Sequence, residues 1–273
     1  MNRKFDWARL MRITVLLGLF LNMSGMAFAN NIIAAYNEAQ KGVTIRTLNL
    51  QQVGVISTTH PVNGVAAGPD NNVYMVDQNH IYNYSITTSS RTQDMQFPDA
   101  RIIYTDISVR GNRVYASYKG SQQGVTIRDL NLNQLSIIPT TFDINGIAAG
   151  TNNDLYLASG NKLYRYGTNG VLLKVMTFPD PSIVYTDVAV ICGRLLASYK
   201  SPNQRGFTIR DLVTLNQYAF VQTNFDIGGI VGGSNNDVYL SGDNTLYNYT
   251  LTGQFIQKFT WPQADLVYGD LTR

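Results

Sequence analysis

The chain has 273 residues, of which 44% are hydrophobic and only 14% are charged, and its formal net charge is +3. The first 29 residues hold four of the 21 basic residues and one of the 18 acidic residues, so the remainder is electrically balanced. This balance excludes nucleic-acid-binding proteins, which need a basic surface. With Cys192 as the only cysteine, an internal disulfide is excluded as well.

Residues 1–29 are predicted to be a secretory signal peptide. A basic start, which includes Arg3 and Arg12, precedes an apolar run over 13–21, and Ala27 and Ala29 supply small residues for cleavage after Ala29. The alternative is an N-terminal membrane anchor, but the apolar run is short for a span of about 20 residues. We therefore expect a secreted or periplasmic protein with no stable membrane span after cleavage.

The rest of the chain is predicted to consist of short strands joined by tight turns. Residues 72–76 alternate between apolar and polar types, 77–79 form a turn, and 80–84 return as a second strand. The same pattern recurs at 154–166 and 237–249. A second pattern, a strand over 104–109 followed by one over 113–119, recurs at 185–190 and 194–200.

These patterns are parts of one unit of about 82 residues that is present three times. Its clearest marker is Gly-Val-Thr-Ile-Arg at 42–46 and 124–128, which becomes Gly-Phe-Thr-Ile-Arg at 206–210. Each unit contains two related halves of about 41 residues, the length of one four-stranded propeller blade. The sequence therefore predicts an all-β, six-bladed β-propeller.

The two ends of the chain are predicted to complete one blade together. Residues 32–37 match only the second strand of the repeat, and the missing first strand appears at 266–271. Ring closure by the C-terminal strand would leave no open sheet edge toward the channel. The propeller domain is assigned to residues 30–273. The expected blades are 30–59 with 265–273, then 60–99, 100–140, 141–180, 181–223 and 224–264.

Residues 146–166 carry a family resemblance. The segment Gly-Ile-Ala at 146–148, the strand Asn-Asp-Leu-Tyr-Leu at 153–157 and the strand Asn-Lys-Leu at 161–163 resemble the blade pattern of NHL-type and related six-bladed propellers. That resemblance implies the fold. It implies little about activity, because the group includes protein-interaction scaffolds, lactonases and lyases. It also implies a site on the channel face formed by the loops before the inner strands and between the second and third strands.

The candidate ligand-binding residues are those expected at this mouth in three-fold repetition. Tyrosines supply stacking surface, while lysines and glutamines of the longer loops supply hydrogen bonds. The candidates are Tyr104, Tyr185, Tyr268, Lys119, Lys200, Gln122, Gln204 and Gln40.

Asp106, Asp187 and Asp270 occupy equivalent positions, each two residues after one of these tyrosines. Three carboxylates at a channel mouth are candidate ligands for Ca²⁺, which prefers oxygen donors. The alternative is that each carboxylate accepts backbone N–H groups within or between blades. A further repeated set, Arg46, Arg128 and Arg210, is expected to form salt bridges across blades.

No catalytic residue is assigned. Two histidines, His60 and His80, are too few for a multi-histidine zinc site, and no nucleophile elbow is present. We expect an exported binding or scaffold module for a protein or an extracellular or cell-envelope glycan. The alternatives are a Ca²⁺-dependent lactonase- or lyase-type enzyme and a multivalent lectin with equivalent pockets between blades.

Overall fold

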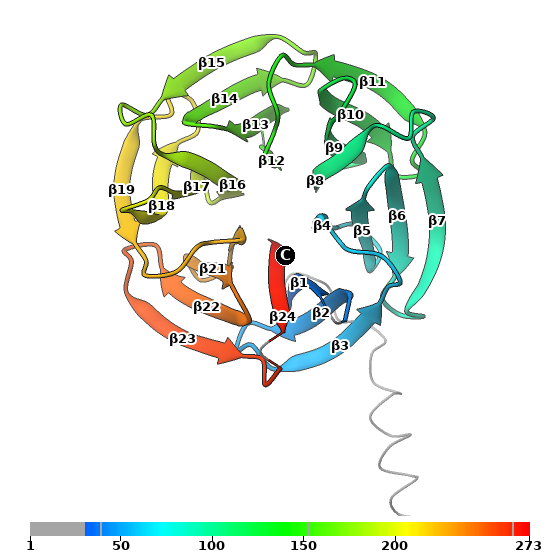
Figure 1. The fold of residues 1–273 in the computed structure, drawn as a ribbon, viewed down its shortest axis with the longest axis horizontal. Helices are drawn as coiled ribbons and strands as arrows, with labels where there is room; N and C mark the ends of the chain where they lie inside the picture. Colours follow the sequence, from blue (N-terminus) through cyan, green and yellow to red (C-terminus); the bar gives the residue numbers. More distant parts are fainter. Residues whose placement is uncertain (1–30, 39, 152, 264) are drawn as a thin grey trace, which may run out of the picture.

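The computed structural model describes residues 31–38, 40–151, 153–263 and 265–273, so the expected signal peptide lies outside the described residues. Within these ranges 24 strands form six four-stranded antiparallel sheets. Figure 1 shows the sheets as blades around a central channel, which confirms the predicted six-bladed β-propeller. No helix in the described ranges is long and apolar enough to cross a membrane.

Each blade is listed from its inner to its outer strand. Blade 1 contains β24 (Leu266–Thr272), β1 (Asn31–Glu38), β2 (Gly42–Thr47) and β3 (Gln52–Ser57). Blade 2 contains β4 (Gly64–Ala67), β5 (Asn72–Asp77), β6 (His80–Ser85) and β7 (Ser90–Gln96). Blade 3 contains β8 (Ile103–Arg110), β9 (Arg113–Lys119), β10 (Gly124–Asp129) and β11 (Gln134–Pro139).

The second half of the ring follows the same order. Blade 4 contains β12 (Gly146–Ala149), β13 (Asp154–Ser159), β14 (Lys162–Gly167) and β15 (Leu172–Thr177). Blade 5 contains β16 (Val184–Ile191), β17 (Arg194–Lys200), β18 (Arg205–Asp211) and β19 (Gln217–Gln222). Blade 6 contains β20 (Gly229–Gly232), β21 (Asp237–Gly242), β22 (Thr245–Thr250) and β23 (Phe255–Thr260).

Ring closure occurs as predicted. The C-terminal strand β24 pairs antiparallel with β1, for example Asn37 with Val267, and so completes blade 1 from the inside. Figure 1 shows β24 beside β1 with the C-terminus at the channel. The first and the last strands of the described residues therefore share one sheet.

The core is divided into clusters that lie between neighbouring blades. At the closing junction, Ile32, Ala34 and Tyr36 of β1 pack with Tyr239 and Leu246 of blade 6. At the opposite side of the ring, Tyr115 and Val125 of blade 3 pack with Leu155 and Leu157 of blade 4. Because each blade buries both of its faces in this way, its middle strands are buried on both sides.

The inner strands differ between odd and even blades. The even blades have inner strands of four residues, whereas β8 and β16 have eight and β24 has seven. The longer strands contain a register shift, which in blade 3 lies between Tyr104 and Asp106. A bulge of this kind changes the direction in which the following side chain points. Here that side chain is the repeated aspartate.

The prediction of cross-blade salt bridges by the repeated arginines is wrong. Arg46 Nη1 donates to the Leu50 carbonyl at 2.7 Å, and Arg128 and Arg210 make the same bond to Leu132 and Leu215. Those carbonyls belong to the turn that connects the third and fourth strands of the same blade. The turn residue has a positive φ in all three copies, near +60°. Each arginine therefore stabilises a local turn.

Candidate functional site

One face of the ring has a cavity of about 710 Å³ at the mouth of the channel. Its wall combines the residues before the even inner strands, the first residues of the odd inner strands and the ends of the second strands of odd blades. The lining residues that repeat are Val62 and Ile144, Asn63 and Asn145, Ile103 and Val184, Thr105 and Thr186, and Lys119 and Lys200. The described loop residues between the second and third strands of the odd blades, such as Gln122 and Gln204, are not among the lining residues.

An apolar collar borders this mouth: two of its three residues line the cavity, and the third is their equivalent in blade 1. We use the term for Ile103, Val184 and Val267, the equivalent residues near the starts of β8, β16 and β24. Their side chains are 42%, 37% and 39% exposed, although β-branched side chains in this ring are otherwise mostly buried. Below the collar, Thr105 Oγ1 bonds to Ser117 Oγ at 2.8 Å and Thr186 Oγ1 bonds to Ser198 Oγ at 2.8 Å.

The rings of the three candidate tyrosines are buried, although Tyr104 is one of the residues that line the cavity. Tyr104, Tyr185 and Tyr268 are at most 1% exposed and lie within inner strands, whereas the sequence analysis expected their rings at the channel mouth. Alternation along a strand explains this, because the residue next to a channel-facing one points into the space between blades. Tyr104, for example, packs edge-on against Phe97 and Tyr118. Their assignment as ligand-binding rings is therefore replaced by a core role.

The candidate lysines lie at the mouth, and the glutamines lie on the loops around it. Lys119 and Lys200 end β9 and β17 and line the cavity. Lys200 Nζ lies 3.8 Å from Asp226 Oδ2, and Arg205 Nε lies 2.6 Å from Asp226 Oδ1. The glutamines Gln40, Gln122 and Gln204 are exposed to solvent.

The third sector of the mouth departs from the repeat. Asn37 stands where the other sectors have Lys119 and Lys200, and it exchanges two hydrogen bonds with the Val62 backbone, at 2.8 and 3.0 Å. Gly228 and Gly269 replace the asparagine and threonine of the other sectors. The missing side chains leave Asp270 as part of the cavity wall, while Asp106 and Asp187 lie in the narrower channel below.

The three aspartates connect each odd blade to the next blade along the ring. Asp106 accepts from Ile107 N on Oδ1 and from Ile147 N on Oδ2, both at 2.6 Å. Asp187 makes the equivalent bonds to the backbone nitrogens of residues 188 and 230, and Asp270 to those of residues 271 and 65. Each carboxylate therefore uses both oxygens to join two inner strands, the structural alternative considered above.

Burial and mutual repulsion favour the protonated form of these carboxyl groups. Loss of hydration raises the pKa of Asp270 to about 7, and the hydrogen bonds from backbone N–H groups make this rise smaller than burial alone would. Burial, followed by the charges of the other two aspartates, raises the pKa of Asp106 well above its ordinary value. Burial and the charge of Asp270 act on the pKa of Asp187 in the same direction.

A calcium role for this ring stays a prediction. Among the described residues, no group of three or more histidine, cysteine, aspartate or glutamate side chains has an arrangement that could hold a metal ion. Both oxygens of each carboxylate already accept backbone N–H groups. Calcium coordination would have to share or replace these bonds.

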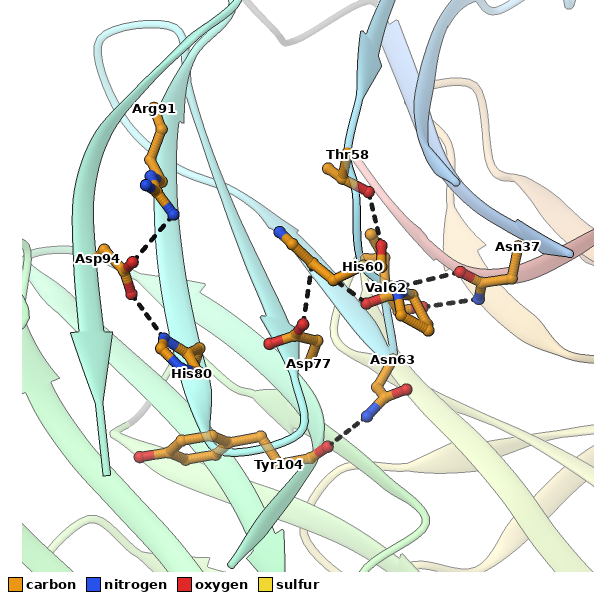
Figure 2. Close-up of polar contacts among 11 residues, drawn as sticks. Asn37, Thr58, His60, Val62, Asn63, Asp77, His80, Arg91, Asp94 and Tyr104 are labelled. Atoms are coloured by element: carbon orange, nitrogen blue, oxygen red, sulfur yellow. Dashed lines mark hydrogen bonds and ion pairs between the residues drawn. The ribbon is translucent and has the colours of Figure 1, made fainter. Parts of the chain in front are cut away.

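Blade 2 contains a polar network that the sequence analysis did not find (Figure 2). His60 Nδ1 lies 3.0 Å from Asp77 Oδ2, and the His60 ring stacks on Tyr82 with centroids 4.3 Å apart. On the outer strands, His80 Nδ1 lies 2.8 Å from Asp94 Oδ1, whose other oxygen accepts from Arg91 at 2.9 Å.

This network replaces apolar contacts of the sister blades. Phe142 and Phe225 occupy the position of His60 and stack on Tyr164 and Tyr247, with centroids 4.1 and 3.9 Å apart. Ser159 and Gly242 occupy the position of Asp77. Burial raises the pKa of Asp77, and the neighbouring His60 lowers it. Aligning the three repeats would have shown these coincident replacements, but not that the new residues touch.

No protein-family model matches the chain, and no curated protein has a significantly similar sequence. Solved structures do match. A protein of unknown function from Bacteroides caccae superposes with a TM-score of 0.72 at 10% identity, over 89% of this chain and 98% of its own. A chain of a nidogen–laminin complex gives a TM-score of 0.74 at 11% identity, over 89% of this chain and 97% of its own length.

The WD40 propeller domain of Doa1 gives a TM-score of 0.64 at 12% identity, over 88% of each chain. At such low identities these similarities show the β-propeller fold alone. The narrower resemblance to NHL-type repeats stays a prediction.

Proposed function

We propose that this chain is an exported binding module and that the channel mouth recognises a protein partner. The observation that carries the proposal is the apolar collar, of which Ile103 and Val184 line a cavity of about 710 Å³ and Val267 is the equivalent exposed residue of blade 1. Exposed apolar side chains that surround a concavity and have a charged rim are typical of protein-binding surfaces. The rim here includes Lys119 and the Lys200–Asp226 pair.

The surroundings of the mouth also favour binding over catalysis. The lining residues are mostly aliphatic, hydroxyl and amide side chains, and the carboxylates below them hold backbone amides. One structural neighbour comes from a nidogen–laminin complex, which is consistent with recognition of proteins by this fold. The predicted signal peptide supports export to a compartment outside the cytoplasm.

Two double variants with matched exposure test the proposal. Ile103→Glu with Val184→Glu places charges on the collar, where the side chains are 42% and 37% exposed. Ile137→Glu with Val175→Glu places the same charges on the outer strands β11 and β15, where exposure is 40% and 37%. All four sites are partly solvated, so both variants should melt close to the parent protein.

The proteins are immobilised and incubated with envelope and culture-medium fractions of the producing organism. We expect the parent and the outer-strand variant to retain the same partner, and the collar variant to lose at least nine tenths of it. Equal capture by both variants, or loss in the outer-strand variant alone, would contradict a site at the mouth.

A further inference from the structure

One of the three sectors of the channel mouth lacks side chains that the other two have. We call it the closing sector, because it lies where blade 6 meets blade 1, and define it by Gly228 before β20 and by Tyr268, Gly269 and Asp270 of β24. Gly228, Gly269 and Asp270 line the cavity of about 710 Å³. Among the described residues that line this cavity, Asp270 is the one acidic residue.

The backbone does not require glycine at position 269. Its φ lies outside the left-handed region that favours glycine. A Cβ at this position would have Asn37 Nδ2 as its nearest neighbour, at 3.9 Å, which is an ordinary van der Waals distance. There is room for a side chain such as the threonine of the sister sectors, and its absence leaves an opening beside Asp270.

The sister sectors show which chemical group fits this opening. Asn63 Nδ2 donates to Tyr104 O at 2.9 Å (Figure 2), and the equivalent asparagine before β12 donates to Tyr185 O at 2.8 Å. Gly228 has no side chain to make this bond, although a Cβ on it would lie 3.0 Å from Tyr268 O. Tyr268 O therefore lacks the N–H donor of its two equivalents, and a ligand with an N–H group can supply it.

The charges around the mouth favour a cation in the closing sector. By strand register, the neutral Asn37 takes the place of Lys119 and Lys200, which repel a cation from the other two sectors. Burial has removed hydration from Asp270 and raised its pKa to about 7. A positive charge within about 4–6 Å favours the ionised carboxylate and would compensate for this loss.

A lysine side chain of a protein partner meets these requirements. Its ammonium group is a compact charge with three N–H donors, and its flexible stem can cover apolar surface such as the collar. Each oxygen of Asp270 accepts one backbone N–H group and has a further lone pair. We propose that the partner inserts the ammonium group of a lysine into the closing sector, where it donates to Tyr268 O and to the Asp270 carboxylate. This assignment rests on the proposed recognition of a protein at the mouth.

Two simple amines test the closing sector. The probe is n-hexylammonium, whose alkyl chain stands for the lysine stem. The control is n-hexyltrimethylammonium, which has the same charge and chain but no N–H donor. Binding is followed by NMR of protein with isotope-labelled glycines at about pH 8, where a primary amine is protonated. The signals of Gly228 and Gly269 are identified from their absence in Gly228→Ala and Gly269→Thr.

We expect saturable shifts of both glycine signals with hexylammonium. The control should bind at least tenfold more weakly, the value of one charge-assisted hydrogen bond. This comparison uses the parent protein and does not depend on how the variants fold. Equal binding of the two amines, or shifts confined to glycines outside the closing sector, would overturn the proposal.

A matched pair of variants tests the same sector with the partner. Gly269→Thr restores the threonine of the sister sectors, so it should weaken hexylammonium binding at least tenfold and reduce capture of the partner in the same proportion. Gly54→Thr makes the same change in β3 of the same blade, at a residue that is also partly exposed, and should alter neither.

The capture experiment separates this assignment from the proposed function. If Gly269→Thr captures the partner like the parent while the double variant of the collar does not, the lysine assignment is wrong and recognition at the mouth stands. Capture that survives in the collar variant would overturn both.

Discussion

The channel carboxylates and the histidines of blade 2 are related to the internal repeat in opposite ways. Asp106, Asp187 and Asp270 occur in all three units and make the same pair of backbone bonds in each. His60 occurs once, where the sister units have a phenylalanine that stacks on a tyrosine. Repetition thus marks residues that the ring needs for its geometry, while a departure from repetition marks a position that the fold leaves free.

The channel mouth contains both residues that follow the repeat and residues that depart from it. Its collar repeats three times, but the sector of Asn37, Gly228 and Gly269 departs from the other two. Variants that restore or remove repetition should therefore have different effects on stability and on binding.

The largest expected effect is the loss of ring closure. A chain that ends at Asp265 lacks β24 and leaves Ile32 and Ala34, which are fully buried in the complete ring, against an open edge. We expect no cooperative melting transition and a strong tendency to aggregate. Differential scanning calorimetry with light scattering measures both. A soluble truncated chain with a sharp transition would show that the ring closes without its C-terminal strand.

The next effect is the loss of one repeated carboxylate. Asp187→Ala leaves the backbone N–H groups of Val188 and Ile230 without their acceptors in the interior. A buried donor without a partner costs about 1–3 kcal/mol, so we expect destabilisation by about 3 kcal/mol. Urea unfolding of the parent and the variant gives the difference. A change below 0.5 kcal/mol, as for a surface substitution, would mean that these bonds do not hold the blades together.

Giving blade 2 the residues of its sister blades should leave the stability of the protein unchanged or raise it. His60→Phe with Asp77→Ser recreates the pair found at Phe142 and Ser159. A buried ion pair is often no more stabilising than apolar residues of similar volume. We therefore expect stability within about 1 kcal/mol of the parent, or higher, in the same urea experiment. Destabilisation as large as that of Asp187→Ala would assign the His60–Asp77 pair a structural role equal to that of the carboxylates.

The pH dependence of stability sharpens the comparison further. Burial raises the pKa of Asp270 to about 7 and that of Asp106 and Asp187 well above the ordinary value. The native state then binds more protons than the unfolded state between about pH 4 and pH 7. Stability from these groups is complete below the unfolded pKa and is lost as the pH rises through the folded pKa.

We therefore expect the unfolding free energy to fall between about pH 4 and pH 7, by at most about 1.4 kcal/mol per pH unit for each extra proton bound. Urea unfolding across this range tests the sign. Asp270→Asn cannot titrate and should show a shallower slope. A parent protein whose stability rises over this range, or an unchanged slope in the variant, would contradict the raised pKa values.

The smallest expected effect is that of calcium. Because both oxygens of each carboxylate already accept backbone N–H groups, we expect the melting temperature to change by less than about one degree between added Ca²⁺ and a chelator. A rise of several degrees with Ca²⁺ would assign the ring a metal-ligand role. It would also favour the Ca²⁺-dependent enzyme alternative.

Much of the architecture can be predicted from the sequence because it depends on the spacing of the repeated segments along the chain. The repeat length predicts the blades, and the incomplete first and last copies predict the closure through β24. The positions of Lys119, Lys200 and the three aspartates beside the channel follow from equivalence along the repeat. Spacing does not predict which face of an inner strand points toward the channel, so the prediction that the rings of Tyr104 and its equivalents lie at the mouth is wrong, and they lie in the core.

Other features depend on contacts between strands that are distant in the chain. The pairing of His60 with Asp77 requires the loop before β4 to reach the end of β5. The stacking of Arg46 under Phe259 joins residues of the first and last blades, and it exists only once the ring is closed. Alignment of the three units identifies such positions as exceptions to the repeat, but the contacts that these residues make are known only from the folded ring.

The central claim, recognition of a partner at the channel mouth, is tested most directly by site-specific photo-crosslinking. A photo-reactive amino acid is introduced at Ile103 on the collar or at Ile137 on β11, two sites of similar exposure. After irradiation with the partner-containing fraction, the adducts are identified by mass spectrometry. Adducts to one partner protein from position 103 and none from position 137 are the predicted result. Adducts from position 137 alone would place recognition on the outer strands and contradict the account.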